Sequence, residues 1–165
     1  MAIREIKKFN EQVLRKKCEE VKKIDKDIKK LVVDMIQTME SNAGIGLAAS
    51  QVGVLKRVLV AQVDLKNQQI LVLINPKIIK KSKEKEIDEE GCLSFPGIIL
   101  KIKRAKEIEV EGQDFNGKKI KIKVKGLAAR VLQHEVDHLD GVLFFNRLSF
   151  LKKISFKLKY PSIRF

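Results

Sequence analysis

The sequence lacks the features that mark secreted and membrane-spanning proteins. Its apolar runs fall well short of the roughly 18 residues that a membrane-spanning helix needs. The first residues, MAIREIKK, contain no apolar segment of the kind found in a signal peptide. Only two cysteines are present, Cys18 and Cys92, and a chain of 165 residues can bury a core without disulfides. We therefore expect a reduced, cytoplasmic protein with no membrane partner.

Internal repeats and linkers rich in proline, glycine or serine are also absent, so we expect one domain that spans residues 1–165. From Asp25, a residue suited to cap a helix, apolar side chains recur at the spacing of an amphipathic helix that ends near residue 42. A second helix is predicted at 127–139.

Short alternating segments predict strands in the rest of the chain. Residues 58–63 and 70–74 have the pattern of two strands, the second closed by Asn75-Pro76, and a hairpin is predicted across Asn116-Gly117. The highly charged residues 80–90 are interpreted as a surface loop. These elements predict an α+β fold, with antiparallel sheets packed around the second helix as a central helix and an additional N-terminal helix.

Histidine is equally scarce, and both copies lie in one stretch, QHEVDHLDG, at 133–141. On an α-helix, which turns about 100° per residue, His134 and His138 lie about 40° apart on one face, so both imidazoles can reach one metal ion. Glu135 projects beside them, where a carboxylate can accept a proton from a metal-bound water. The pattern favours a metal-dependent hydrolase; a histidine pair with a purely structural role is the competing interpretation.

The end of the chain lacks any further ligand. After Asp140, the remaining 25 residues contain no Asp, Glu, His or Cys. A catalytic metal site usually takes three protein ligands, so the third must lie upstream. Cys92 is the better candidate, because thiolates bind such metals strongly and its segment is bounded by glycine and proline. Cys18 is the rival, although its lysine-rich surroundings are more typical of an ordinary, partly buried cysteine.

Acidic residues are outnumbered, and the net charge is +14, with 28 lysines against seven arginines. This excess favours a polyanionic partner such as RNA, but a coding bias toward lysine explains it equally well. The basic C-terminal segment, residues 147–165, has no acid, and its conformation is left open: Leu148, Leu151 and Leu158 suit a helix, whereas the alternation from Ile154 to Tyr160 suits a strand.

A glycine-rich stretch at 44–53, GIGLAASQVG, allows close approach of the backbone but matches no phosphate-binding loop. Taken with two later stretches, it resembles the three motifs of the peptide deformylase family, in the family's order and spacing. The similarity covers roughly residues 10–148 and rests on the segments VLR at 13–15, GIGLAASQVG at 44–53, INP at 74–76, EGCLSFPG at 90–97 and QHEVDHLDG at 133–141.

The resemblance implies a metal centre with a defined set of ligands. Cys92, His134 and His138 match the family's metal ligands, and Glu135 matches its general base. One divalent ion per chain is implied, Fe²⁺ in the cell, with Zn²⁺, Ni²⁺ or Co²⁺ able to occupy the same site. The implied reaction is hydrolysis of the N-formyl group from the formylmethionine of newly made polypeptides, with release of formate.

Further roles follow from the same resemblance. Gln51 and the backbone N–H of Leu93 match donors that stabilise an oxyanion, and Gly46 matches a backbone contact to the substrate. Glu90 and Arg104 resemble a supporting ion pair. Ser50 departs from the family, which usually has proline there; proline would fix the backbone, so we expect a looser loop before Gln51.

The methionine side chain of the substrate needs an apolar pocket. Ile45, Leu127 and Val131 are predicted to line it, because they lie beside the expected ligands in sequence or on the helix. We expect a monomer, with the basic C-terminal segment able to dock on ribosomal RNA as in some family members. The alternative function is a basic ribosome- or RNA-binding module whose metal site is structural.

Overall fold

The computed structural model describes residues 2–64, 66–67 and 69–163. Residues 164–165, the end of the predicted basic C-terminal segment, lie outside the described residues. The elements, in chain order, are η1 Gln12–Arg15, α1 Lys26–Ser41, β1 Gly46–Ala48, η2 Ala49–Val52, β2 Val58–Asp64, β3 Gln69–Lys81, β4 Lys85–Glu90, β5 Leu100–Ala105, β6 Glu107–Gln113, β7 Lys119–Lys125, α2 Gly126–Leu139, η3 Phe144–Arg147 and α3 Phe150–Lys159.

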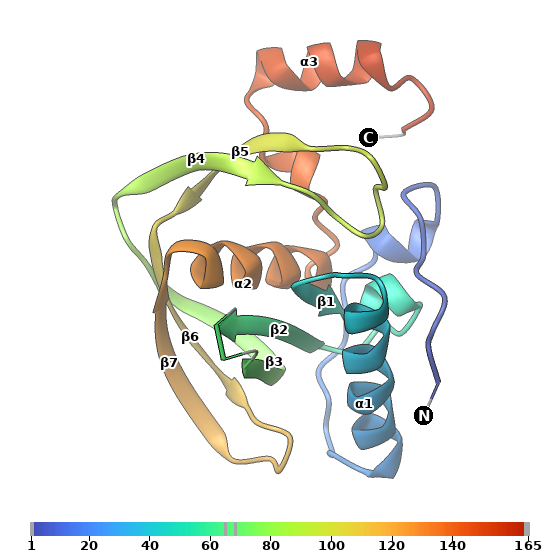
Figure 1. Ribbon diagram of the computed structural model, residues 1–165, viewed down its shortest axis with the longest axis vertical. Coiled ribbons are helices and arrows are strands. Elements are labelled where there is room, and N and C mark those ends of the chain that lie inside the picture. The colour runs from blue at the N-terminus through green and yellow to red at the C-terminus, as the bar shows by residue number, and fades with distance from the viewer. Residues whose placement is uncertain (1, 65, 68, 164–165) are drawn as a thin grey trace.

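Two antiparallel sheets enclose the second helix. The larger sheet has the strand order β1-β2-β3-β6-β7, and β4 pairs only with β5 in a separate two-stranded ribbon. Figure 1 shows α2 between this ribbon and the larger sheet, with α1 beside β1 and β2, and α3 beyond the ribbon. The predicted mixed α/β class with antiparallel sheets is confirmed.

Helix α2 is buried along almost its whole length, from Ala129 to Leu139. Its apolar side chains Leu132, Val136 and Leu139 belong to one core cluster with residues of the larger sheet, including Leu59. A helix that buries its polar face as well must pair every polar group inside the protein. The polar residues of α2 are therefore the ones to follow toward the functional site.

Strand β3 is longer than the sequence pattern indicated, so the prediction that Asn75-Pro76 ends it was wrong. The strand continues to Lys81, and its pairing with β6 shifts register between Ile74 and Lys77. Asn75 adopts a positive φ of 54° there, and its side chain bonds the backbone N–H and C=O of Val21. A bulge lets a strand pass through a proline, because the missing N–H falls outside the ladder.

The charged segment 80–90 is not the surface loop that its composition indicated. Residues Lys85–Glu90 form β4, which pairs with β5 in a register that sets Glu89 opposite Lys101 and Ile87 opposite Lys103. Its side chains are exposed up to Glu89, and only Glu90 is buried. This strand carries the chain directly to Cys92.

Lysines recur along β7, at one edge of the larger sheet. Three glutamates of β6 lie opposite lysines of β7, in the pairs Glu107–Lys125, Glu109–Lys123 and Glu111–Lys121. Opposite charges across a strand pair support one register, and lysines on an edge strand oppose pairing with other chains.

The C-terminal segment, whose conformation the sequence left open, is helical at Phe150–Lys159. None of the described helices is long and apolar enough to cross a membrane.

Candidate metal centre

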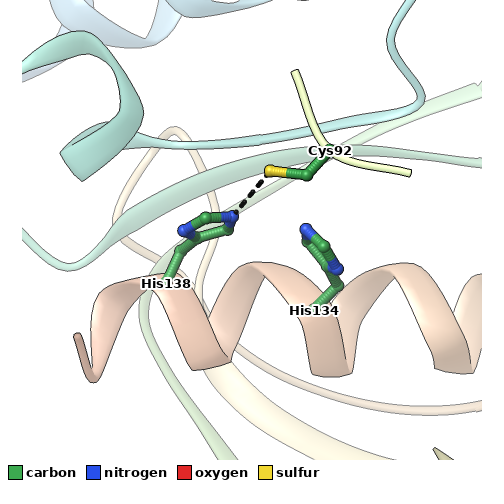
Figure 2. Close-up of side chains that lie close together, drawn as sticks. All are labelled: Cys92, His134 and His138. Carbon is green, nitrogen blue, oxygen red and sulfur yellow. Dashed lines mark hydrogen bonds between the residues drawn. The ribbon is translucent and has the colours of Figure 1, made fainter. Parts of the chain in front are cut away.

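Three potential ligands meet where α2 passes under the segment that follows β4. His134 and His138 project from the same face of α2 toward Cys92, as Figure 2 shows. The ligand atoms of these three side chains all lie within 4.8 Å of one another, and Cys92 Sγ is 3.2 Å from His138 Nε2. Cys18, the rival candidate, is buried elsewhere, where its backbone N–H bonds the carbonyl of Leu139.

The donor set fits a divalent transition metal. Thiolate and imidazole ligands at about 2.3 Å and 2.0 Å from a tetrahedral ion lie about 3.3–3.6 Å from each other. The observed separations, 3.2 Å between Cys92 Sγ and His138 Nε2 and at most 4.8 Å among the three ligand atoms, need only small side-chain rotations to reach that geometry. Burial lowers the pKa of His138 well below its usual range, which keeps its ring in the neutral form that binds metals.

His134 is oriented by a buried carboxylate. Its Nδ1 lies 3.0 Å from Oε2 of Glu90 and donates to that carboxylate, which leaves Nε2 as the nitrogen that can bind a metal. Glu90 also accepts hydrogen bonds from Arg104 and from Arg130, at 2.9 Å and 2.7 Å. Although burial opposes it, the bonds from His134 and Arg104 hold the pKa of Glu90 at about 2. The carboxylate therefore stays ionised and fixes the ring.

A second buried carboxylate, Asp137, holds the other end of this network. Arg104 bonds it on one side, and Arg147 donates to it from Nε at 2.9 Å on the other. Neither Asp137 nor Arg130 was assigned a role from the sequence. Arg130 also donates to the carbonyls of Ile102 and Glu86, so it ties α2 to both strands of the β4–β5 ribbon.

Glu135 lies beside the ligands with one oxygen unpaired. Among the described residues, Oε2 of Glu135 and Nδ1 of His138 are the buried side-chain atoms without a hydrogen-bond partner. Burial raises the pKa of Glu135 to about 7, above its ordinary 4.5, with the charge of His134 opposing the shift. A carboxyl group with a pKa near neutrality can both accept and return a proton at physiological pH.

The site opens into a cavity of about 540 Å³. Ile45, Leu127 and Val131, the three residues predicted to line a pocket, all border this cavity together with His134 and Glu135. Ile45 and Leu127 are 37% and 44% exposed, so they lie at its mouth, whereas Val131 is buried at 6%. The arrangement can accept an apolar side chain whose backbone lies next to the ligands.

Gln51 and Leu93 flank the cysteine from two different segments. Nε2 of Gln51 lies 3.6 Å from Cys92 Sγ and donates to Ser94 Oγ at 3.3 Å, while its Oε1 accepts from the backbone N–H of Ala48. These contacts aim the amide N–H groups at the site. The carbonyl of Leu93 accepts a hydrogen bond from the Lys8 ammonium.

Comparison with known proteins identifies the family. The family model described as polypeptide deformylase matches residues 3–154. The chain is 49% identical to the peptide deformylase of Thermodesulfovibrio yellowstonii over 98% of this chain and 99% of that protein. It is 51% identical to the peptide deformylase of Dictyoglomus thermophilum over 88% of this chain and 92% of that protein.

Solved structures agree. The peptide deformylase of Thermus thermophilus superposes with a TM-score of 0.91 at 38% identity, covering 97% of this chain and 94% of that one. That of Ehrlichia chaffeensis in complex with actinonin gives a TM-score of 0.89 at 41% identity, with all of both chains covered. The alternative of an RNA-binding module with a structural metal has no support among these relatives. The chain therefore belongs to the polypeptide deformylase family, hydrolases that remove the N-formyl group from newly made polypeptides.

Proposed function

We propose that this chain hydrolyses the N-terminal formylmethionine amide through one divalent metal ion held by Cys92, His134 and His138. The observation that carries the proposal is the meeting of three ligand atoms within 4.8 Å, beside a buried carboxylate oxygen that has no hydrogen-bond partner. A closed structural site would have four ligands, whereas three leave room for a water. The products are formate and a polypeptide with a free amino terminus.

Fe²⁺ is the proposed cellular metal, and Zn²⁺, Ni²⁺ or Co²⁺ would be accepted by the same thiolate and imidazoles. When bound, such an ion polarises a water so that it becomes a nucleophile near neutral pH. The protein orients the ligands: Glu90 fixes His134 through Nδ1, and Arg104 fixes Glu90.

Glu135 is the proposed general base. Glu135 borders the cavity, its Oε2 has no hydrogen-bond partner, and a pKa of about 7 suits a group that must take a proton from the nucleophile and pass it to the departing amine. Because Glu135 is buried, bulk water cannot easily exchange that proton before it is delivered.

Gln51 and the backbone N–H of Leu93 are the proposed donors to the formyl oxygen as negative charge develops on it. The Nε2 amide group of Gln51 already contacts Cys92 Sγ and Ser94 Oγ, while its side-chain oxygen accepts the N–H of Ala48. Loss of one such donor in other hydrolases costs on the order of 3 kcal/mol of transition-state stabilisation. The backbone of Gly46 is the proposed contact to the substrate's own backbone.

Ile45, Leu127 and Val131 are the proposed walls of the methionine pocket. Their shared cavity with His134 supports this assignment. Val131→Asp should lower kcat/KM for a formyl-methionyl peptide more than for a formyl-alanyl peptide, because the buried carboxylate opposes an apolar side chain. Leu158→Asp, at an exposed apolar residue of α3, is the matched control. Unchanged discrimination in Val131→Asp would remove this residue from the pocket.

Residues 1–165 are proposed to form a single, monomeric catalytic domain, because α2 contacts strands of both sheets. It would act in the cytoplasm, where new polypeptides emerge. Helix α3, with four lysines and no acid in Phe150–Lys159, is the proposed docking element for ribosomal RNA. Deletion of residues 149–165 should lower ribosome affinity and flatten its salt dependence; unchanged binding at all salt concentrations would contradict this.

Formate release tests the main proposal. The protein is prepared anaerobically with Fe²⁺ or Ni²⁺, and formate is measured with a formyl-methionyl peptide in wild type, Glu135→Gln and the exposed control Glu86→Gln. We expect full metal content in all three proteins and loss of turnover only in Glu135→Gln. Absence of formate from metal-loaded wild type would reject the proposed function.

A further inference from the structure

Ser50 connects the segment that carries Gln51 to the helix that carries His134 and His138. It lies in η2 immediately before Gln51, it is fully buried, and its Oγ lies 3.2 Å from the backbone carbonyl oxygen of His138. Because a carbonyl oxygen can only accept, the Ser50 hydroxyl must donate this bond. The bond joins residues 88 positions apart in the chain, one beside the amide donor and the other a proposed metal ligand.

The neighbouring groups leave the hydroxyl proton available for this bond. The Cys18 thiol also lies against Ser50, and burial raises the pKa of that thiol to about 11. The thiol therefore keeps its own proton and does not need one from Ser50. The η2 segment is a short 3₁₀ helix whose N-cap residue, Ala48, makes no side-chain cap bond, and such helices have poorer hydrogen-bond geometry than α-helices. Tertiary contacts must therefore hold it in place.

Both ends of the bond have other anchors within their own segments. The carbonyl of His138 also accepts the N–H groups of Asp140 and Gly141, which cap α2, and the next carbonyl, that of Leu139, accepts from Cys18. The last turn of α2 thus has several anchors besides Ser50. On the other side, the Gln51 carbonyl accepts the N–H of Lys7, but the Ser50 hydroxyl supplies the side-chain bond from η2 to α2, so its loss would free η2 to shift relative to the metal ligands.

We propose that Ser50 is a positioning residue, whose bond to α2 fixes the amide of Gln51 relative to the metal ligands and acts on the reaction only through Gln51. The inference rests on the proposed function, because it assumes that Gln51 donates to the reacting group. It replaces the expectation of a looser loop at this position with a defined tether. Ser50→Ala removes a single oxygen atom, so the fold has little to accommodate.

A double-mutant cycle separates positioning from general stabilisation. Ser50→Ala should lower kcat about fivefold with KM nearly unchanged, the factor expected for one neutral hydrogen bond that matters in the transition state. In a Gln51→Ala background the same change should alter kcat by less than about twofold. Ser82→Ala is the matched control, since its hydroxyl also donates to a backbone carbonyl, that of Glu84, far from the site. It should leave kcat unchanged.

Hydrogen–deuterium exchange of the metal-loaded protein gives a second readout that does not depend on activity. Ser50→Ala should speed exchange in peptides that cover residues 47–53 and leave those that cover 130–140 unchanged. Formate release by wild type establishes the proposed function separately. Equal losses of kcat in both backgrounds, an unchanged kcat in Ser50→Ala, or loss of metal from Ser50→Ala would each overturn the inference.

Discussion

Replacing Gly46 by alanine should impair the reaction while the protein stays folded and binds metal. A Cβ atom built on Gly46 would lie 2.5 Å from Oε1 of Glu135 and 2.8 Å from Cγ1 of Val131. Ordinary van der Waals contact begins at 3.4 Å, so the Glu135 carboxylate would have to move by about 0.9 Å. The backbone of Gly46 needs no positive φ, so the substitution strains only these side chains.

The size of the effect follows from that displacement. Moving a catalytic group by about 1 Å can cost on the order of 100-fold in rate, which equals about 2.7 kcal/mol of activation free energy. Overpacking of the buried site should cost a further 1–3 kcal/mol, roughly, in the free energy of unfolding. The signature expected is a large fall in kcat, a lower but measurable Tm, and one metal ion still bound.

Steady-state formate release, metal analysis and thermal unfolding measure these three quantities. Gly91→Ala is the matched control, because a Cβ there meets no atom within 4 Å and the backbone φ is not positive. It should keep kcat within about twofold of wild type. A Gly46→Ala protein that binds metal and retains wild-type kcat would refute the claim that catalysis depends on the observed position of Glu135.

Two further predictions concern stability. Arg130→Met should lower the free energy of unfolding by about 1–3 kcal/mol, because it removes one of the two buried arginines that bond Glu90 and leaves ribbon carbonyls without their donor; urea denaturation beside the exposed control Lys103→Met measures this, and equal midpoints would contradict it. The hydrogen bond from the Lys30 ammonium holds the pKa of Asp34 at about 2, below its ordinary 3.8. Burial opposes this shift, and the bond from the Ala2 N–H adds to it. Asp34→Asn should therefore cost about 1–2 kcal/mol at pH 7. The difference should be full above the unfolded pKa of 3.8 and should be lost as the pH falls through the folded pKa of about 2; a full difference that persists below pH 2 would show another origin.

Local patterns in the sequence were enough to find the helix of the site. The spacing of His134, Glu135 and His138 depends only on the geometry of one helical turn, which is the same in every fold. The absence of acids, histidines and cysteines after Asp140 then directed the search upstream, where Cys92 stands beside the histidines in the structure. Both steps used composition and local spacing alone.

Long-range pairing explains what could not be predicted. Strand β4 has no alternation of apolar and polar residues, because its side chains are exposed up to Glu89, so only its pairing with β5 makes it a strand. Pro76 appeared to end β3 because a bulge cannot be recognised before the partner strand is known. These are tertiary effects that override local preference.

The Glu90–Arg104 pair was expected, but the parts of Arg130 and Asp137 in the buried charge network were missed for a similar reason. A polar arc on a helix is usually solvated, and nothing in the local sequence distinguishes Arg130 and Asp137 from surface residues. Burial of Glu90 at the end of an otherwise exposed strand creates the need for their charges. The density of polar residues on a helix that also carries two metal-binding histidines is the only local signal that could have indicated it.

Metal titration of the stripped protein tests the central claim most directly. The protein is freed of metal with a chelator, Ni²⁺ is added back anaerobically in steps, and both bound metal and formate release from a formyl-methionyl peptide are measured at each step. We expect activity to rise in proportion to bound metal and to saturate at one ion per chain. Formate release without metal, or a full complement of metal at Cys92, His134 and His138 without formate release, would contradict the account.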